Sequence, residues 1–160
     1  MERIKLNPGD KAVDFKLIGD DEKEHTLDDF KGKKLILYFY PRDNTSGCTR
    51  EAVGFTEHLE EIESLNATVV GISPDSIKSH KKFKEKHGLK ILLLSDPDKK
   101  VAESYGAYGE KKMYGKVTKG IIRSTFIIDE NGIILKPFYN VKVNGHVEKV
   151  IEFLKGLSNE

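Results

Sequence analysis

The fold of this chain is decided by residues 35–51, which read LILYFYPRDNTSGCTRE. The run Leu35–Tyr40 is apolar throughout and rich in strand-forming residues, which predicts a strand buried on both faces. After a polar loop, apolar residues recur at helical spacing and predict a helix from about Thr49 to Leu65. A strand that leads directly into a helix places the intervening loop at the C-terminal edge of an α/β sheet, where ligand crevices lie.

The rest of the chain alternates between strand and helix patterns. Further strands are predicted at Asp14–Ile18, Glu24–Thr26, Ala67–Ile72, Ile91–Leu94, Ile121–Asp129 and Ile133–Tyr139. Further helices are predicted at Leu27–Phe30, Asp75–His87, Asp96–Tyr105 and Gly145–Leu157. We interpret the glycine- and lysine-rich stretch Gly106–Gly120 as a loop.

This order of elements predicts one α/β domain over residues 1–160. Strands separated by helices imply right-handed parallel crossovers, and the late hairpin adds antiparallel strands. We therefore expect a mixed central sheet with helices on both faces and an N-terminal β-hairpin extension. The order suits a thioredoxin-like fold, although other α/β sandwiches would also fit the pattern alone.

The composition argues against several classes of partner. With 27 basic and 26 acidic side chains the net charge is +1, which gives no electrostatic reason to expect nucleic acid or an anionic membrane. No apolar run approaches the roughly 18–20 residues of a membrane span. The first residues carry no apolar stretch of signal-peptide length, so we expect a cytoplasmic protein.

We expect neither a metal nor a cofactor. The glycines match neither the phosphate-loop nor the dinucleotide-binding spacing. The five histidines show no metal-binding spacing, and we interpret them as surface residues. These are His25, His58, His80, His87 and His146.

Cys48 is the only cysteine, which excludes an intramolecular disulfide, a CxxC redox pair and a cysteine-rich zinc site. A lone cysteine is usually a small buried hydrophobic residue. Here, however, its neighbours Ser46-Gly47 and Thr49-Arg50-Glu51 are polar, and it lies where a helix begins. These surroundings favour a nucleophile.

A reactive thiol needs a cation beside it. The thiolate is the reactive form, and a free thiol has a pKa of about 8.5. A helix N-terminus contributes only about 0.3–1 kcal/mol, so an arginine is required, and Arg42, Arg50 and more distant arginines are candidates. If such a thiolate attacks the O–O bond of a peroxide, negative charge builds on the departing oxygen. The Thr45 hydroxyl, backbone N–H groups and a guanidinium can stabilise this charge.

The spacing Pro41-x-x-x-Thr45-x-x-Cys48 resembles the active-site motif of the peroxiredoxins. The wider run YFYPRDNTSGCTREA resembles the branch called bacterioferritin comigratory protein, or peroxiredoxin Q, and the likeness continues in PGDKAVDF, GEKKMYGK, IIRSTFIIDENG and GHVEKVIEFLK. The resemblance implies a thioredoxin-like fold and a thiol-dependent peroxidase. Hydrogen peroxide and organic hydroperoxides would be its substrates, and its role would be antioxidant defence.

The resemblance also implies a role for each residue of the motif. Cys48 would be the peroxidatic cysteine, which the peroxide oxidises to sulfenic acid. Thr45 would hydrogen-bond the thiolate and the peroxide, and Pro41 would shield the sulfenate from water. Arg123 would activate thiolate and peroxide, with Glu51 orienting it.

The chain departs from many members of this branch at Val53, where they carry a second cysteine that resolves the sulfenic acid. We therefore expect a one-cysteine mechanism in which an external thiol regenerates Cys48: thioredoxin, glutaredoxin or a low-molecular-weight thiol. We expect a monomer or a homodimer.

Two other functions stay open from the sequence. The chain could be a redox-sensing or thiol-relay protein, which would not consume peroxide in steady state with a thiol donor. It could also be a non-catalytic thioredoxin-like binding domain in which Cys48 only packs, and Cys48→Ser would then change nothing.

Overall fold

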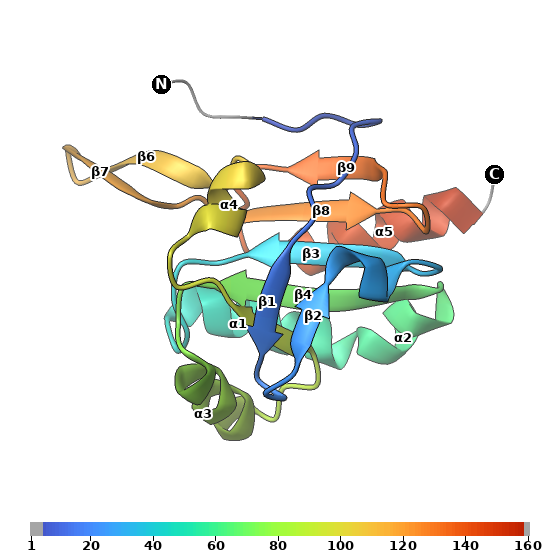
Figure 1. Ribbon diagram of the computed structural model, residues 1–160, viewed down its shortest axis with the longest axis horizontal. Coiled ribbons are helices and arrows are strands. Elements are labelled where there is room, and N and C mark those ends of the chain that lie inside the picture. Colours follow the sequence, from blue (N-terminus) through green and yellow to red (C-terminus); the bar gives the residue numbers. More distant parts are fainter. Residues whose placement is uncertain (1–4, 159–160) are drawn as a thin grey trace.

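The computed structural model of the chain describes residues 5–158, so both ends of the expected 1–160 domain lie outside the described residues (Figure 1). Seven strands form one mixed sheet in the order β2-β1-β5-β4-β3-β8-β9. They are β1 Lys16–Gly19, β2 Glu24–Thr26, β3 Lys34–Phe39, β4 Ala67–Ser73, β5 Leu92–Ser95, β8 Ser124–Ile128 and β9 Ile134–Phe138. The three central strands β3, β4 and β5 run parallel, and antiparallel hairpins lie at both edges. The predicted mixed sheet and N-terminal hairpin are confirmed.

Strand β3 lies between β4 and β8 and supplies side chains to both faces of the sheet. Because successive side chains of a strand point to opposite faces, Ile36 and Tyr38 enter one core while Leu37 and Phe39 enter the other. All four are completely buried. The prediction that this strand is buried on both faces of the sheet is therefore confirmed.

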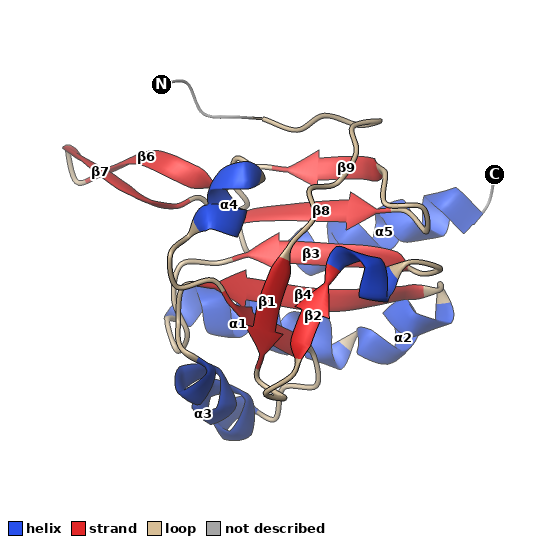
Figure 2. Cartoon of the chain, viewed as in Figure 1, coloured by secondary structure: helices blue, strands red, loops and turns tan. Residues whose placement is uncertain are grey.

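Helices cover both faces of this sheet (Figure 2). The core on the Ile36 side is completed by helices α1 Ser46–Glu57, α2 Leu59–Ser64, α3 Ile77–His87 and α5 His146–Ser158. The core on the Leu37 side is completed by the 3-10 helix η1 Leu27–Phe30 and the short helix α4 Lys100–Ser104. Within residues 5–158 no helix has the length and apolar character that a membrane crossing requires.

The helix that follows β3 differs from its predicted bounds. It begins at Ser46 because Thr45, with φ −83° and ψ 153°, is still extended and serves as the N-cap. It is also divided at His58, after which α2 begins with Glu60 and Glu61 in its first turn, where negative side chains are favourable. The helix thus begins three residues before its predicted start at Thr49, and Cys48 lies in the first turn of α1, as expected.

The interpretation of Gly106–Gly120 as a loop is wrong. Strands β6 Tyr108–Met113 and β7 Lys116–Ile121 pair antiparallel as a separate two-stranded sheet that projects from the body of the protein (Figure 1). Tyr114 and Gly115 make the turn, both with positive φ. Most side chains of this hairpin are exposed, so the apolar alternation that marks a half-buried strand is missing from its sequence.

The start of α4 also differs from the sequence prediction. The predicted helix started at Asp96, but α4 begins at Lys100. The carboxylate of Asp96 reaches forward instead and accepts hydrogen bonds from the backbone N–H groups of Val101 and Ala102, at 3.4 and 3.0 Å. Asp96 therefore stabilises the helix start from four residues upstream.

Candidate active site

Cys48 lies at the C-terminal edge of the central strands, in the first turn of α1. The backbone N–H of Thr49 donates to the carbonyl of Thr45 at 2.8 Å, so the N–H groups of the preceding residues have no partner within the helix. Such a helix start favours negative charge. The Cys48 side chain is only 1% exposed. The thiol is therefore held at a position that suits a thiolate, with little access to bulk solvent.

Arg123 connects this thiol to the interior. It lies in the two-residue segment between β7 and β8, and its Nη2 donates to Sγ of Cys48 at 3.2 Å while its Nη1 donates to Oε1 of Glu51 at 2.8 Å. Burial disfavours the charge of the guanidinium, but Glu51 and Cys48 outweigh burial and raise the pKa of Arg123. A Cβ on Gly47 would lie 3.3 Å from Nη2, so glycine leaves the guanidinium the room it uses.

Glu51 is a buried carboxyl, 0% exposed, one helical turn after Cys48. Burial raises its pKa to about 7, and the charge and hydrogen bond of Arg123 only partly oppose this shift. Within the described residues its Oε2 has no hydrogen-bond partner, and neither does the buried hydroxyl of Tyr38. The charge of Glu51, and with it the share of the Arg123 charge left for Cys48, therefore changes close to neutral pH.

Of the candidate arginines within residues 5–158, Arg123 is the one that reaches the sulfur. Arg42 and Arg50 are exposed, and Arg50 donates from Nη1 to Oδ1 of Asn144 at 2.8 Å. That bond ties the first turns of α1 to the segment before α5, but it leaves the Arg50 charge in solvent. The cation that the chemistry requires thus comes from a residue 75 positions away from Cys48.

Thr45 and Pro41 lie in the loop between β3 and α1. The Thr45 hydroxyl donates to the carbonyl of Arg42 at 2.9 Å, and no hydrogen bond to Sγ of Cys48 is formed. Pro41 is half-buried. The structure therefore brings Cys48, Glu51 and Arg123 into direct contact, whereas Thr45 would have to turn its hydroxyl to bond the sulfur or a peroxide.

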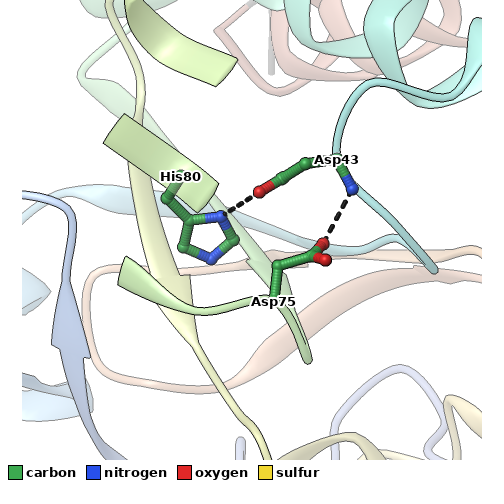
Figure 3. Close-up of side chains that lie close together, drawn as sticks. All are labelled: Asp43, Asp75 and His80. Atoms are coloured by element: carbon green, nitrogen blue, oxygen red, sulfur yellow. Dashed lines mark hydrogen bonds and ion pairs between the residues drawn. The ribbon is translucent and has the colours of Figure 1, made fainter. Parts of the chain in front are cut away.

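Residues that sequence reasoning missed hold this loop in place. Asp43 lies in its middle, and its carboxylate accepts from the Tyr40 hydroxyl at 2.6 Å. The same carboxylate accepts from His80 Nδ1 at 2.7 Å, while the backbone N–H of Asp43 donates to Oδ2 of Asp75 at 2.7 Å (Figure 3). The Ser79 hydroxyl donates a third bond to the same carboxylate, at 2.8 Å. Residues just after β3 and β4, together with two side chains of α3, thereby fix the loop that carries Pro41 and Thr45.

The interpretation of the histidines as surface residues is wrong for two of the five. His80 is completely buried, and its Nε2 lies 2.9 Å from the carbonyl of Leu94, so both ring nitrogens face acceptors. The signal was its position three residues before the apolar Phe83, on the same face of α3. His146 is 3% exposed; burial, then Lys149 and Arg123, lower its pKa to about 4, and Nε2 lies 2.8 Å from the Thr125 hydroxyl.

The cluster Asp43, Asp75 and His80 offers ligand atoms within 4.8 Å of one another, a spacing that a metal ion could use. Each of these atoms already has hydrogen-bond partners in the protein. A cation would have to displace the hydrogen bonds that hold the loop. We therefore interpret the cluster as a structural network.

The family match, the similar sequences and the similar structures all belong to one group of proteins. Residues 8–136 match the AhpC/TSA family. A putative peroxiredoxin bcp of Helicobacter pylori is 53% identical over 150 residues, which cover 94% of this chain and 99% of the relative. A solved cysteine mutant of Xylella fastidiosa PrxQ superimposes with a TM-score of 0.90 at 38% identity, covering 97% of this chain and 99% of that one.

A trapped-intermediate structure of the Xanthomonas campestris bacterioferritin comigratory protein, from work on its alkyl peroxide reduction activity, is also similar. Its TM-score is 0.84 at 37% identity, covering 89% of this chain and 90% of that one. These likenesses confirm the predicted thioredoxin-like fold.

Proposed function

Because the chain belongs to the AhpC/TSA family and is a peroxiredoxin, a thiol peroxidase, we propose that it reduces hydrogen peroxide and organic hydroperoxides through a sulfenic acid at Cys48. The observation that supports this most is the position of Arg123. Its two terminal nitrogens join the sulfur of Cys48 to the carboxyl of Glu51. A guanidinium at 3.2 Å stabilises a thiolate and can also donate to a bound peroxide.

In the first step the Cys48 thiolate attacks the terminal oxygen of the peroxide. The S–O bond forms as the O–O bond breaks, so sulfur is oxidised to sulfenic acid and the departing oxygen leaves as an alkoxide or hydroxide. That oxygen takes up a proton to give the alcohol or water. Arg123 and the free N–H groups at the start of α1 stabilise its charge.

Three other residues prepare this step. Glu51 orients the guanidinium, which would otherwise be free to rotate away from the sulfur. Thr45 supplies a hydroxyl to the thiolate and the peroxide once it leaves the Arg42 carbonyl. Pro41 limits the access of water to the sulfenate.

The chain contains no second cysteine, so the sulfenate is reduced from outside. A first external thiol attacks the sulfenic sulfur, which forms a mixed disulfide and releases water. A second thiol then reduces this disulfide, which restores Cys48 and leaves the reductant as a disulfide. Thioredoxin, glutaredoxin or a small thiol can supply both, and the cytoplasm keeps such thiols reduced.

Intact-mass analysis after one equivalent of peroxide, with a sulfenic-acid trap present, tests the proposal. We expect one trap adduct per chain and none in Cys48→Ser, which should also stop consuming peroxide with dithiothreitol. Unchanged peroxide consumption by Cys48→Ser would overturn the proposal. Stoichiometric oxidation without turnover would support the thiol-relay function instead.

A further inference from the structure

The β6–β7 hairpin carries charge and apolar surface that the peroxidase chemistry does not use. Residues 108–121 hold four lysines and one glutamate, a net charge of +3, whereas the whole chain has +1, so the remaining residues together carry −2. None of these four lysines forms an ion pair with a carboxylate of residues 5–158. The hairpin is thus a concentrated and unpaired positive surface.

The tip of the hairpin exposes an aromatic side chain in an unfavourable backbone conformation. Tyr114 is 99% exposed and has φ +54°, followed by Gly115 with φ +78°. Two-residue hairpin turns with positive φ at both positions favour asparagine or aspartate before the glycine, because bulky residues adopt this region poorly. Val117 is a further exposed apolar residue, at 56%. Folding alone does not account for a tyrosine here.

The hairpin lies next to the peroxidatic site. Strand β7 ends at Ile121, two residues before Arg123, and the N–H of Ile122 donates to the carbonyl of Ala107 at 2.7 Å, which closes the base of the hairpin. Lys111 is half-buried and interacts electrostatically with both Arg123 and Cys48. One face of the hairpin is therefore directed toward the cysteine.

The strand register divides the lysines between two faces. In the antiparallel pairing, Lys111 lies opposite Thr118, and position 113 lies opposite Lys116. Residues that lie opposite each other share one face of the hairpin. We call the positions on the same side as Lys111 the cysteine-side face: Gly109, Lys111, Lys116, Thr118 and Gly120. The opposite face carries Glu110, Lys112, Val117 and Lys119.

We propose that the cysteine-side face of the hairpin, together with Tyr114 at its tip, is the docking surface for an acidic protein dithiol that reduces the Cys48 sulfenate. This inference rests on the proposed function. An exposed tyrosine beside unpaired lysines is typical of the anchors of protein interfaces, and complementary charge accelerates association. The strands span about 20 Å at 3.3 Å per residue, so a small thiol could contact only one or two of these side chains at once.

The reductant supplies two thiols. Its first thiol forms a mixed disulfide with Cys48 and releases the sulfenate oxygen as water, and its second thiol displaces Cys48 and leaves as the protein disulfide. Docking on the hairpin would hold the partner beside α1 during both exchanges. That matters because the sulfur is 1% exposed and an attacking protein thiol must approach it closely.

Two charge reversals on the same strand give a matched test. Lys116→Glu and Lys119→Glu change the charge equally but lie on the cysteine-side and the opposite face, respectively. Tyr114→Asn removes the aromatic ring and creates Asn-Gly, the pair that this type of turn favours, so the variant should fold like the wild type. The rate of sulfenate reduction is measured by stopped flow with an acidic bacterial thioredoxin and, separately, with dithiothreitol.

We expect Lys116→Glu and Tyr114→Asn each to lower the thioredoxin rate by about fivefold or more, and Lys119→Glu by less than about twofold. The dithiothreitol rate and the oxidation by peroxide should stay within about twofold for all three variants. Raising NaCl from about 20 to about 300 mM should slow thioredoxin but not dithiothreitol. Equal losses for the two lysine variants, or no loss in Lys116→Glu and Tyr114→Asn, would overturn the docking surface.

A binding measurement separates this inference from the proposed function. Cys48→Ser cannot form a sulfenate, yet an NMR titration with reduced thioredoxin should shift amides of residues 108–121 and of the loop before α1. If the wild-type chain formed no sulfenate while these shifts appeared, the proposed function would fail and the docking surface would stand. If no amide of the hairpin shifted, the docking surface would be wrong even for an active peroxidase.

Discussion

The substitution Glu51→Gln tests the electrostatic role of the buried carboxyl directly. Glutamine has almost the same shape and keeps an oxygen that can accept from Nη1 of Arg123, as Glu51 does at 2.8 Å. It cannot ionise, however. The substitution therefore removes the charge that competes with Cys48 for the guanidinium while preserving the local packing.

The magnitude follows from the pKa of Glu51. Burial raises this pKa from 4.5 to about 7. Between these pH values the folded chain holds a proton that the unfolded chain has released, so the free energy of unfolding falls as pH rises through this window. At 1.36 kcal/mol per pKa unit, ionising Glu51 costs the fold about 3 kcal/mol above pH 7. Glu51→Gln avoids this cost.

Urea unfolding at a series of pH values between about 5 and 8 measures the effect. We expect Glu51→Gln to match the wild type near pH 5 and to exceed its stability by about 3 kcal/mol at pH 8, since the curves should diverge as Glu51 ionises. Glu57→Gln, on the exposed side of the same helix, is the matched control and should follow the wild type. Parallel curves for Glu51→Gln and wild type would refute the reasoning.

Four further outcomes are expected. Arg123→Lys should slow peroxide oxidation of Cys48 by about 100-fold in stopped flow, since one ammonium cannot bond both the sulfur and the carboxyl; a change below threefold would contradict this. His80→Ala should lower the free energy of unfolding in urea by about 3 kcal/mol or more, because a buried carboxylate loses its partner. The wild type should lose about 3 kcal/mol of unfolding free energy between pH 6.5 and 4, because the pKa of buried His146 is lowered to about 4 and only the unfolded chain takes up its proton in this range. His146→Leu should not show this loss; the same decrease in the variant would refute the prediction. Oxidation of Val53→Cys should raise amide exchange over residues 48–56, because side chains five apart on a helix point about 140° away from each other and a disulfide requires unwinding, whereas the native chain should show no such rise.

The central part of the fold could be predicted because its signals are local. Residues 35–40 form a continuous apolar run, and β4 is rich in β-branched residues. Helix α3 is followed by Gly88, which takes the left-handed conformation that a helix C-terminus favours. The β6–β7 hairpin could not be predicted in the same way, because its strands are mostly exposed. Its pairing depends on backbone hydrogen bonds and a turn at Tyr114-Gly115, and neither produces an apolar period.

For the candidate site too, local features could be predicted from the sequence and long-range contacts could not. The polar neighbours of Cys48 and its place at a helix start are readable from adjacent residues. The contact with Arg123 joins residues 75 apart, and here the resemblance to a family, rather than any spacing, indicated it. The helical spacing of His80 and Phe83 indicated that His80 is buried, but no local pattern paired it with Asp43, because only the folded chain brings the two side chains within 2.7 Å.

Arg123 lies in the two-residue segment that joins the β6–β7 hairpin to β8, so a change in the length of this segment would also move the active-site guanidinium. Lengthening both strands of the hairpin by two residues adds paired backbone beyond its base and leaves the base where it is. A single residue inserted between Ile121 and Ser124 instead shifts the phase between the hairpin and β8 and turns Arg123 away from the sulfur. A hairpin from another protein can therefore replace this one only if the connection to β8 keeps its two residues, so that Arg123 still points toward the sulfur.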